Sequence, residues 1–277
     1  MSVALPVPRT AAGVAGLAAL LTEPGRAVLA SDFDGTLAPI VARPEDARPA
    51  AGAIDALARL AAVVGRLVIV TGRPVDSVRE IAGLTGRPEL AGVTVLGHYG
   101  LERWDVGADT VDRPDPDPGL DVVRQELPAL LAGLPGAVIE DKQHSVAVHT
   151  RSASDPAAAF AALLPPLRDL AARAGLEAVE GRYVVELRPG GLDKGSTLLA
   201  FAAEARASCV AFMGDDLGDL PAFAAVDELR RGGTPGLTVA SASDEVAEVS
   251  AAADVVVDGP AGIVAFLGAV ADALERS

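Results

Sequence analysis

The sequence predicts an α/β fold in which a parallel sheet, covered by helices on both faces, is interrupted by an inserted α+β unit. Short strands alternate with helical segments near both ends of the chain. These strands are apolar throughout rather than at every second residue, which is typical of a buried parallel sheet. In the middle of the chain, neighbouring strands joined by short turns indicate antiparallel pairing instead.

The elements before the interruption alternate in order along the chain. We expect a helix over 11–21, a strand over 27–32, a helix over 50–65, a strand over 66–73, a helix from Pro74 and a third strand within 92–104. Pro24 and Gly25 close the first helix, and Pro74 suits the first turn of its helix.

The interruption begins in the proline-rich segment 106–119. We expect a helix near 119–133, strands over 137–142 and 145–151, a helix over 155–174, and strands over 176–180 and 183–189. The first pattern then returns with a helix over 193–205, a strand over 209–216, a helix over 218–226, strands over 236–241 and 253–258, and a last helix over 260–274. The sequence therefore predicts a core from 1–106 and 187–277 and an inserted unit from 107–186.

Composition excludes several classes of partner and site. The 277 residues carry a net charge of −15, with a pI near 4.6, which argues against binding to nucleic acid or to an anionic membrane. Cys209 is the single cysteine, so the sequence predicts no intrachain disulfide and no cysteine zinc cluster, and it suits a reducing cytoplasm. The apolar run 11–21 is too short to span a bilayer and lacks the cationic start of a signal peptide.

Acidic residues follow the apolar strands at three points, namely Asp32 with Asp34, then Asp215, Asp216 and Asp219, and finally Asp258. Ligand sites of open parallel sheets lie beyond the carboxyl ends of the strands, so the first two clusters are expected to meet. Converging carboxylates repel one another, and a hard cation such as Mg²⁺ relieves that repulsion. The ordinary alternative, that these acids cap helices or face solvent, explains single aspartates better than two such clusters.

Two further residues fit an anion site. Thr71 ends the second strand and offers a hydroxyl and backbone N–H groups at a helix start. Lys194 opens another helix and can neutralise an anion as a point charge.

These motifs, "DFDGTL", "VTG", "DKG" and "GDDLGD", resemble the four motifs of the haloacid dehalogenase-like phosphohydrolases. The resemblance implies a Rossmann-like core sheet with an inserted α+β cap of the C2 type at 107–186. It also implies that Asp32 attacks phosphorus and forms an aspartyl-phosphate, while Asp34 acts as general acid and base. Mg²⁺ would be held by Asp32, the Asp34 backbone carbonyl and Asp215, with Asp219 supporting its water shell.

The same resemblance assigns the phosphoryl group its partners. Thr71, Lys194 and the N–H groups around Gly35 would hold the phosphoryl oxygens, and Arg73 is a further candidate for substrate binding. By the same resemblance, an aspartate at position 34 favours a phosphatase over a sugar phosphotransferase or a dehalogenase.

The inserted unit carries polar residues that suit a polyhydroxyl ligand. "EDKQHSVAVHTR" places Glu140, Lys142, Ser145, His149 and Arg151 on or beside a hairpin. This segment resembles the cap motif of the trehalose-6-phosphate phosphatase family, which implies sugar contacts for Glu140, Lys142 and Ser145, while His149 and Arg151 are alternatively cap-stabilising. From the residues alone, an ordinary solvated sheet face explains them equally well.

Two more segments resemble that family. "GHYGLERW" places His98 and Glu102, and "VVELRPGGLDKGSTL" places Glu186 and Arg188, as candidates for substrate binding. The fourth motif departs from the family pattern, because Gly218 stands for a threonine and Leu220 for a glutamate.

The sequence thus predicts a cytoplasmic, Mg²⁺-dependent phosphatase that converts trehalose 6-phosphate to trehalose and phosphate, with a possible functional link to a trehalose-phosphate synthase. The alternatives are a phosphatase for another sugar or glycosyl-glycerate phosphate and, motivated by the altered fourth motif, a weakly catalytic sugar-phosphate sensor.

Overall fold

The computed structural model describes residues 4–41, 43–108, 110–242 and 247–276. The chain divides into two compact units, a core unit of Met1–Arg113 with Asp193–Ser277 and an inserted unit of Pro114–Leu192. The borders between the units lie a few residues beyond the predicted positions 106 and 186. Within the described residues, no helix is both long and apolar enough for a bilayer crossing.

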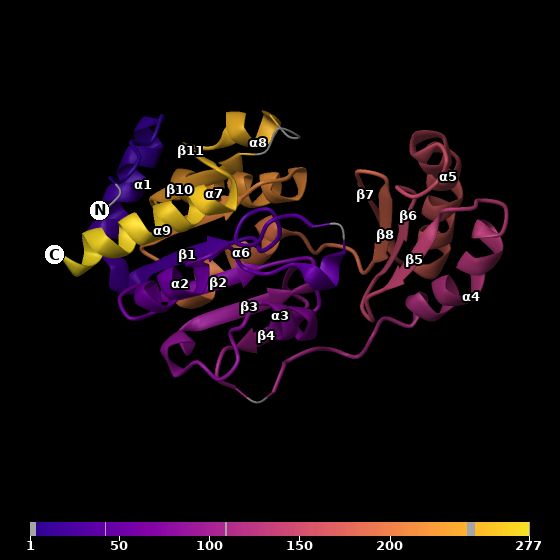
Figure 1. The fold of residues 1–277 in the computed structure, drawn as a ribbon, viewed down its shortest axis with the longest axis horizontal. Coiled ribbons are helices and arrows are strands. Elements are labelled where there is room, and N and C mark those ends of the chain that lie inside the picture. The colour runs from indigo at the N-terminus through magenta and orange to yellow at the C-terminus, as the bar shows by residue number, and fades with distance from the viewer. Residues whose placement is uncertain (1–3, 42, 109, 243–246, 277) are drawn as a thin grey trace. The chain divides into compact units, whose positions relative to one another are not determined.

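In the described part of the core unit, seven strands form one sheet in the order β11-β10-β9-β1-β2-β3-β4 (Figure 1). The strands are β1 (Ala27–Ser31), β2 (Arg66–Val70), β3 (Val93–Gly97), β4 (Glu102–Asp105), β9 (Cys209–Gly214), β10 (Gly236–Ala242) and β11 (Val255–Asp258). Neighbouring strands are parallel except for β3 and β4. The predicted parallel sheet is therefore confirmed, and β1 and β9, which precede the two aspartate clusters, are direct neighbours.

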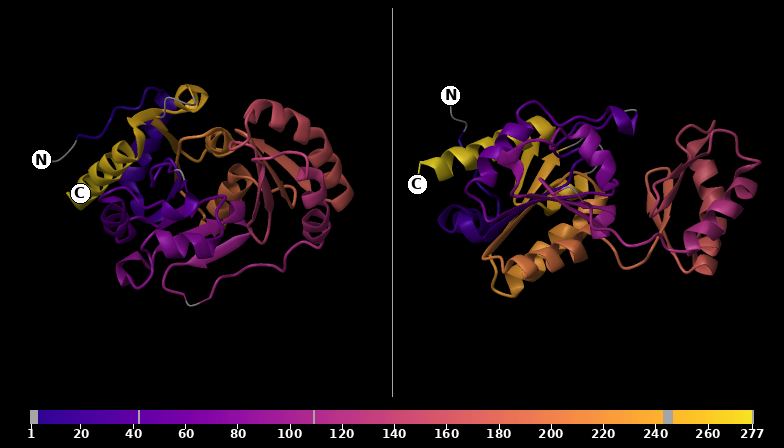
Figure 2. Two further views of the ribbon diagram at one scale, coloured as in Figure 1. Left: turned by 45° about the vertical axis from the view of Figure 1, so that its right-hand side comes forward. Right: turned by 90° about the horizontal axis from the view of Figure 1, so that it is seen from below.

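Helices cover both faces of this sheet, as Figure 2 shows from below. One face packs against α1 (Ala11–Thr22), α2 (Ala53–Ala61), α3 (Val75–Ile81) and α9 (Gly259–Glu275), and the other against α6 (Lys194–Ala205), α7 (Leu220–Arg231) and α8 (Ala247–Ala252). Alternation along β1 explains the two cores, because Leu29 faces the first set of helices, whereas Val28 and Ala30 face the second.

The segment 92–104 contains the predicted third strand and the start of a further strand that the sequence did not predict. It holds β3 and β4, which pair antiparallel with Val95 opposite Trp104. The chain reverses between them through a short turn in which His98 and Tyr99 both have positive φ angles, 47° and 58°. Five short 3₁₀ segments are described, namely η1 (Pro24–Arg26), η2 (Pro44–Asp46), η3 (Pro88–Leu90), η4 (His98–Gly100) and η5 (Leu217–Asp219).

Asp254 ties three elements of the core unit together. It is buried just before β11 and accepts hydrogen bonds from the Thr238 N–H at 2.8 Å and the Thr238 hydroxyl at 3.0 Å. Arg230 of α7 and the hydroxyl of Thr10, which caps α1, also donate to it. Burial opposes ionisation of this carboxyl, but the donors from Thr10, Thr238 and Arg230 outweigh it and lower its pKa.

The inserted unit is a four-stranded antiparallel sheet backed by two helices (Figure 1). Its elements are α4 (Gly119–Leu131), β5 (Val138–Asp141), β6 (Val146–His149), α5 (Pro156–Ala174), β7 (Glu177–Gly181) and β8 (Val184–Arg188), with the strand order β5-β6-β8-β7. Val146, Val148 and Leu187 pack in a core with α4 and α5. Alternation then places Glu186 and His149 on the opposite sheet face.

Candidate active site

The first aspartate motif lies in a tight loop that follows β1. The Asp32 N–H donates to the carbonyl oxygen of Met213 in β9 at 2.9 Å, which extends the pairing of the two strands to their ends. Immediately afterwards the chain turns at Gly35, whose φ is 73°. The Gly35 N–H donates to the Ala38 carbonyl at 2.7 Å and closes the turn.

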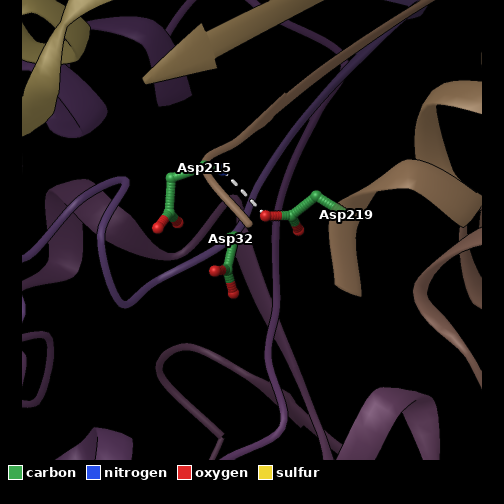
Figure 3. A group of neighbouring side chains, drawn as sticks. All are labelled: Asp32, Asp215 and Asp219. Carbon is green, nitrogen blue, oxygen red and sulfur yellow. Dashed lines mark hydrogen bonds between the residues drawn. The ribbon is translucent and has the colours of Figure 1, made fainter. Parts of the chain in front are cut away.

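Three carboxylates converge at this edge of the sheet. Asp32, Asp215 and Asp219 each offer an oxygen, and these oxygens lie within 4.8 Å of one another (Figure 3). All three residues are buried, with 5%, 4% and 0% of their surface exposed. The structure thus brings together the two clusters that follow β1 and β9, whereas Asp258 is exposed at the start of α9.

The ammonium group of Lys194 pairs with two of these carboxylates. Its Nζ lies 2.9 Å from Asp32 Oδ1 and 2.6 Å from Asp219 Oδ1, and it is itself 5% exposed. Lys194 opens α6, whose first turn is fixed by a reciprocal cap: the Ser196 N–H donates to Asp193 Oδ1 at 2.7 Å and the Asp193 N–H to Ser196 Oγ at 3.2 Å. The helix start therefore aims the ammonium group at the aspartates.

Asp219 also organises the loop after β9. Its Oδ2 accepts a hydrogen bond from the backbone N–H of Asp215 at 2.8 Å (Figure 3). It accepts a second one from the backbone N–H of Asp216 at 3.1 Å. Gly214 permits this close approach, because a Cβ there would lie 2.3 Å from Asp219 Cγ. Asp219 thus holds the backbone of Asp215 in place. The same loop contains Gly218 and Leu220, the two residues that depart from the family pattern.

The cluster contains more acidic side chains than basic ones, and this shifts their pKa values. Burial and the neighbouring Asp219 and Asp216 raise the pKa of Asp215 to about 7. Burial raises the pKa of Asp32 well above its ordinary range in spite of Lys194. The pKa of Lys194 is likewise raised, because Asp219 and Asp32 outweigh its burial. One ammonium group faces several buried carboxylates, and such an oxygen-rich donor set fits a divalent cation.

Two side chains of this site were missed by the sequence reasoning. The Thr36 hydroxyl donates to Asp215 Oδ1 at 3.0 Å, and the Ser241 hydroxyl donates to the Gly35 carbonyl at 2.7 Å. Thr36 lies inside the first motif, and Ser241 lies near the carboxyl end of β10. Their positions at or near the ends of predicted strands were the only feature of the sequence that could have indicated a place in the site. Both residues orient groups that surround the carboxylate cluster.

Asp34 lies apart from the three clustered carboxylates and pairs with Arg73. Arg73 Nε donates to Asp34 Oδ2 at 2.6 Å, and its NH2 donates to Asp34 Oδ1 at 2.7 Å. Arg73 is a candidate for substrate binding, and in this structure its Nε and NH2 atoms are directed at Asp34.

Thr71 and His98 are two further candidates in the core unit. Thr71 is buried at the end of β2, and its hydroxyl oxygen accepts the Arg73 N–H at 3.2 Å, which leaves its own hydrogen able to donate to an anion. His98 is buried in the turn before β4, and its backbone N–H donates to the Arg73 carbonyl at 3.0 Å. The turn that holds His98 is thereby joined to the Thr71–Arg73 segment.

Glu102, a candidate for substrate binding, lies in the interior of the core unit. It is fully buried, and its Oε2 accepts the N–H of Val75 at 2.6 Å, which caps the start of α3. Its Oε1 lies 3.5 Å from Arg113. A carboxylate that satisfies a helix start in the interior has a structural role, because its loss would leave that N–H group unsatisfied.

In the inserted unit, the candidates meet on the sheet face opposite the helices. Glu186 Oε1 accepts the Ser145 hydroxyl at 2.6 Å and lies 3.3 Å from Lys142 Nζ. Burial opposes ionisation of Glu186, but Lys142 and Ser145 outweigh it and lower its pKa. Glu140 Oε2 lies 2.8 Å from His149 Nε2. Arg188 is buried in β8, opposite Glu177 of β7.

Comparison with known proteins now identifies the family. Residues 30–260 match the sequence model of the family described as trehalose-phosphatase. The chain belongs to the trehalose-phosphatase family. Its membership accounts for the buried aspartates and lysine, since the match spans all four motifs. The family implies a divalent metal ion, and the three clustered carboxylates could hold one.

Curated relatives carry the name of a specific enzyme. The trehalose-phosphate phosphatase of Mycolicibacterium paratuberculosis is 34% identical over 255 residues, which cover 88% of this chain and 62% of that protein. The trehalose-phosphate phosphatase of Mycobacterium marinum is 33% identical over 265 residues, 92% of this chain and 64% of that protein. This member of the trehalose-phosphatase family thus spans less than two thirds of the length of these relatives.

Solved structures show the same fold. The C-terminal domain of a C. albicans trehalose-6-phosphate phosphatase aligns with a TM-score of 0.76 at 20% identity and covers 97% of this chain and 99% of that one. A haloacid dehalogenase-like hydrolase from Bacteroides thetaiotaomicron aligns with a TM-score of 0.58 at 18% identity, over 90% and 98% of the two chains. The predicted haloacid dehalogenase-like fold is confirmed.

Proposed function

We propose that this chain is a Mg²⁺-dependent phosphatase that hydrolyses trehalose 6-phosphate to trehalose and phosphate through an aspartyl-phosphate on Asp32. One observation carries the proposal: a member of the trehalose-phosphatase family buries Asp32, Asp215, Asp219 and Lys194 in one contact group at the end of its central strands. Buried charges in such a group are expensive unless they bind a cation and an anionic substrate.

In the proposed first step, a carboxylate oxygen of Asp32 attacks phosphorus, and the bond between phosphorus and the sugar oxygen breaks. Asp34 gives its proton to the leaving oxygen. Lys194, 2.9 Å from Asp32, and the hydroxyl of Thr71 neutralise the phosphoryl oxygens, together with the N–H groups around Gly35. Phosphoryl transfer depends mainly on such positioning and charge neutralisation.

In the second step, Asp34, now ionised, takes a proton from water as the water oxygen attacks phosphorus. The bond between phosphorus and Asp32 breaks, so that free phosphate and the original carboxylate are restored. Asp34 thus serves as acid and then as base, in keeping with its position two residues from the nucleophile.

Asp32, Asp215 and the backbone carbonyl of Asp34 would hold the metal, with Asp219 supporting its water shell. When bound, Mg²⁺ supplies positive charge that reduces the repulsion between the nucleophile and the phosphoryl group. Mg²⁺ suits this set because its donors are hard oxygen atoms. Thr36 and Lys194 keep the two carboxylates oriented through their bonds to Asp215 and Asp32.

The polar sheet face of the inserted unit is proposed to recognise the sugar. Glu140, Lys142, Ser145, Glu186 and Arg188 share that part of the unit, and the contacts of Glu186 with Lys142 and Ser145 hold its donors and acceptors in place. Mixed donors and acceptors match the hydroxyl groups of a disaccharide. His98 stays a candidate for substrate binding in the core unit.

Phosphate release from a panel of sugar phosphates tests the proposal. We expect trehalose 6-phosphate to be preferred over sucrose, glucosyl-glycerate and mannosylglycerate phosphates, and EDTA to abolish turnover. A preference for another ester would replace the substrate and keep the mechanism. Retained activity in Asp32→Asn would refute the mechanism, and normal turnover would exclude a sensor without catalysis.

Two wider parts of the proposal concern the cell. The single, buried Cys209 suits a cytoplasmic location. The substrate is the product of sugar transfer onto a sugar phosphate, so a functional link with a trehalose-phosphate synthase is proposed.

A further inference from the structure

Arg73 makes a two-pronged ion pair with Asp34. Its Nε and NH2 atoms donate to the two carboxylate oxygens at 2.6 and 2.7 Å, which is the parallel geometry that a guanidinium group forms with a carboxylate. The guanidinium-bearing side chain is 13% exposed and that of Asp34 36%. Both oxygens of the proposed acid and base are therefore engaged by one cation.

The guanidinium group is itself anchored on its remaining side. Its NH1 donates to the Pro44 carbonyl at 3.0 Å and to the Ser77 hydroxyl at 3.4 Å. Its central carbon lies 5.8 Å from the centre of the Phe33 ring. Contacts from η2, α3 and the first motif thus hold the group in one orientation.

The two aspartates of the first motif consequently have separate cations. Lys194 pairs with Asp32 and Asp219, whereas Arg73 pairs with Asp34. The guanidinium donors of Arg73 are taken up by Asp34, by the Pro44 carbonyl and by the Ser77 hydroxyl. The preceding segment supports this arrangement, because the Arg73 N–H donates to Thr71 Oγ1 and its carbonyl accepts the His98 N–H.

We propose that Arg73 is a positioning residue that acts through Asp34 and does not bind the substrate. It holds the Asp34 carboxyl group in the orientation from which a proton passes to the leaving oxygen and is later taken from water. This inference rests on the proposed function, because it requires Asp34 to act as acid and base. A lysine cannot replace the fork, since an ammonium group is a point charge without paired donors.

The first turnover of Arg73→Ala and Arg73→Lys tests the role with two substrates. With trehalose 6-phosphate at saturation, we expect the rate of phosphoryl transfer to fall by about 10- to 100-fold, part of the effect of a general acid, with KM within about twofold of the wild type. With p-nitrophenyl phosphate, the nitrophenolate leaves without a proton, so the initial burst should change by less than about threefold.

A double-variant cycle gives an independent measure. In the Asp34→Asn background, replacing Arg73 with alanine should cause no further loss in the sugar-phosphate rate, because its partner no longer transfers protons. Arg79→Ala is the matched control, since Arg79 lies on the neighbouring helix α3 over the Trp104 ring. Thermal unfolding of each variant separates loss of fold from loss of positioning.

Several outcomes would overturn the inference. A raised KM for trehalose 6-phosphate with an unchanged saturated rate would make Arg73 a sugar ligand. Equal losses with both substrates would make it a phosphoryl ligand, and additive losses in the double variant would separate it from Asp34. If the wild type released phosphate from neither substrate, the proposed function would fail and this role with it, whereas the other outcomes leave the function intact.

Discussion

Gly35 lies so close to Asp215 that a Cβ at position 35 would be 2.0 Å from Asp215 Oδ2. The two residues follow β1 and β9, which are neighbours in the sheet, and the glycine has a φ of 73°. An absent side chain therefore leaves room for one of the proposed metal ligands.

We expect Gly35→Ala to lose at least about 100-fold in Mg²⁺-dependent turnover, because the new methyl group displaces Asp215 and the left-handed backbone adds about 1 kcal/mol of strain. Turnover against Mg²⁺ concentration and urea unfolding measure the two effects. Gly83→Ala is the matched control, with a φ of 67° and nothing within 4 Å of its added Cβ. Similar turnover losses in both variants would refute the role of close packing.

Metal binding should stabilise the folded chain through the carboxylate cluster. At a concentration about 100 times its dissociation constant, Mg²⁺ should add about 2.7 kcal/mol to the free energy of unfolding, which urea titration with and without the ion would detect. Asp215→Asn should remove most of that increment. Asp216→Asn should retain it, because Asp216 is exposed and lies outside the group of clustered carboxylates. Equal stabilisation of both variants would contradict the ligand assignment.

Asp254 should make stability depend on pH in the acid range. Its pKa is lowered in the folded chain, so its contribution is fully present above the ordinary aspartate range and is lost as the pH falls through its folded value. We expect Asp254→Asn to lower the free energy of unfolding by about 1–3 kcal/mol at pH 7, with a smaller difference from the wild type near pH 3. Asp55→Asn, whose side chain is 82% exposed, is the control. A difference independent of pH would contradict this prediction.

Glu102 should matter for stability rather than for substrate selection. Glu102→Gln weakens the cap on the Val75 N–H and the ion pair with Arg113, at a cost of about 1–2 kcal/mol in the free energy of unfolding. The KM for trehalose 6-phosphate should stay within about twofold of the wild type. A large rise in KM with unchanged stability would restore Glu102 as a substrate ligand.

Local signals in the sequence predicted most of the elements and the meeting of the two aspartate clusters. Continuous apolar strands alternating with helices indicated the parallel sheet. Aspartates at two strand ends indicated the edge of the sheet at which the carboxylates lie together. The reversal at His98 escaped prediction, because the turn uses positive φ angles at His98 and Tyr99, residues that rarely adopt them. Thr36 and Ser241 escaped because a single hydroxyl carries no pattern.

By itself, the sequence determined the fold class and the types of residue at the strand ends, because periodicity and spacing act over short stretches of chain. Only the tertiary structure decided which groups pair: Lys194 with Asp32 and Asp219, Arg73 with Asp34, and Glu102 with the start of α3. Such pairings depend on strand order and on side-chain orientation across the fold. They join positions far apart in the chain, where spacing alone specifies neither distance nor direction.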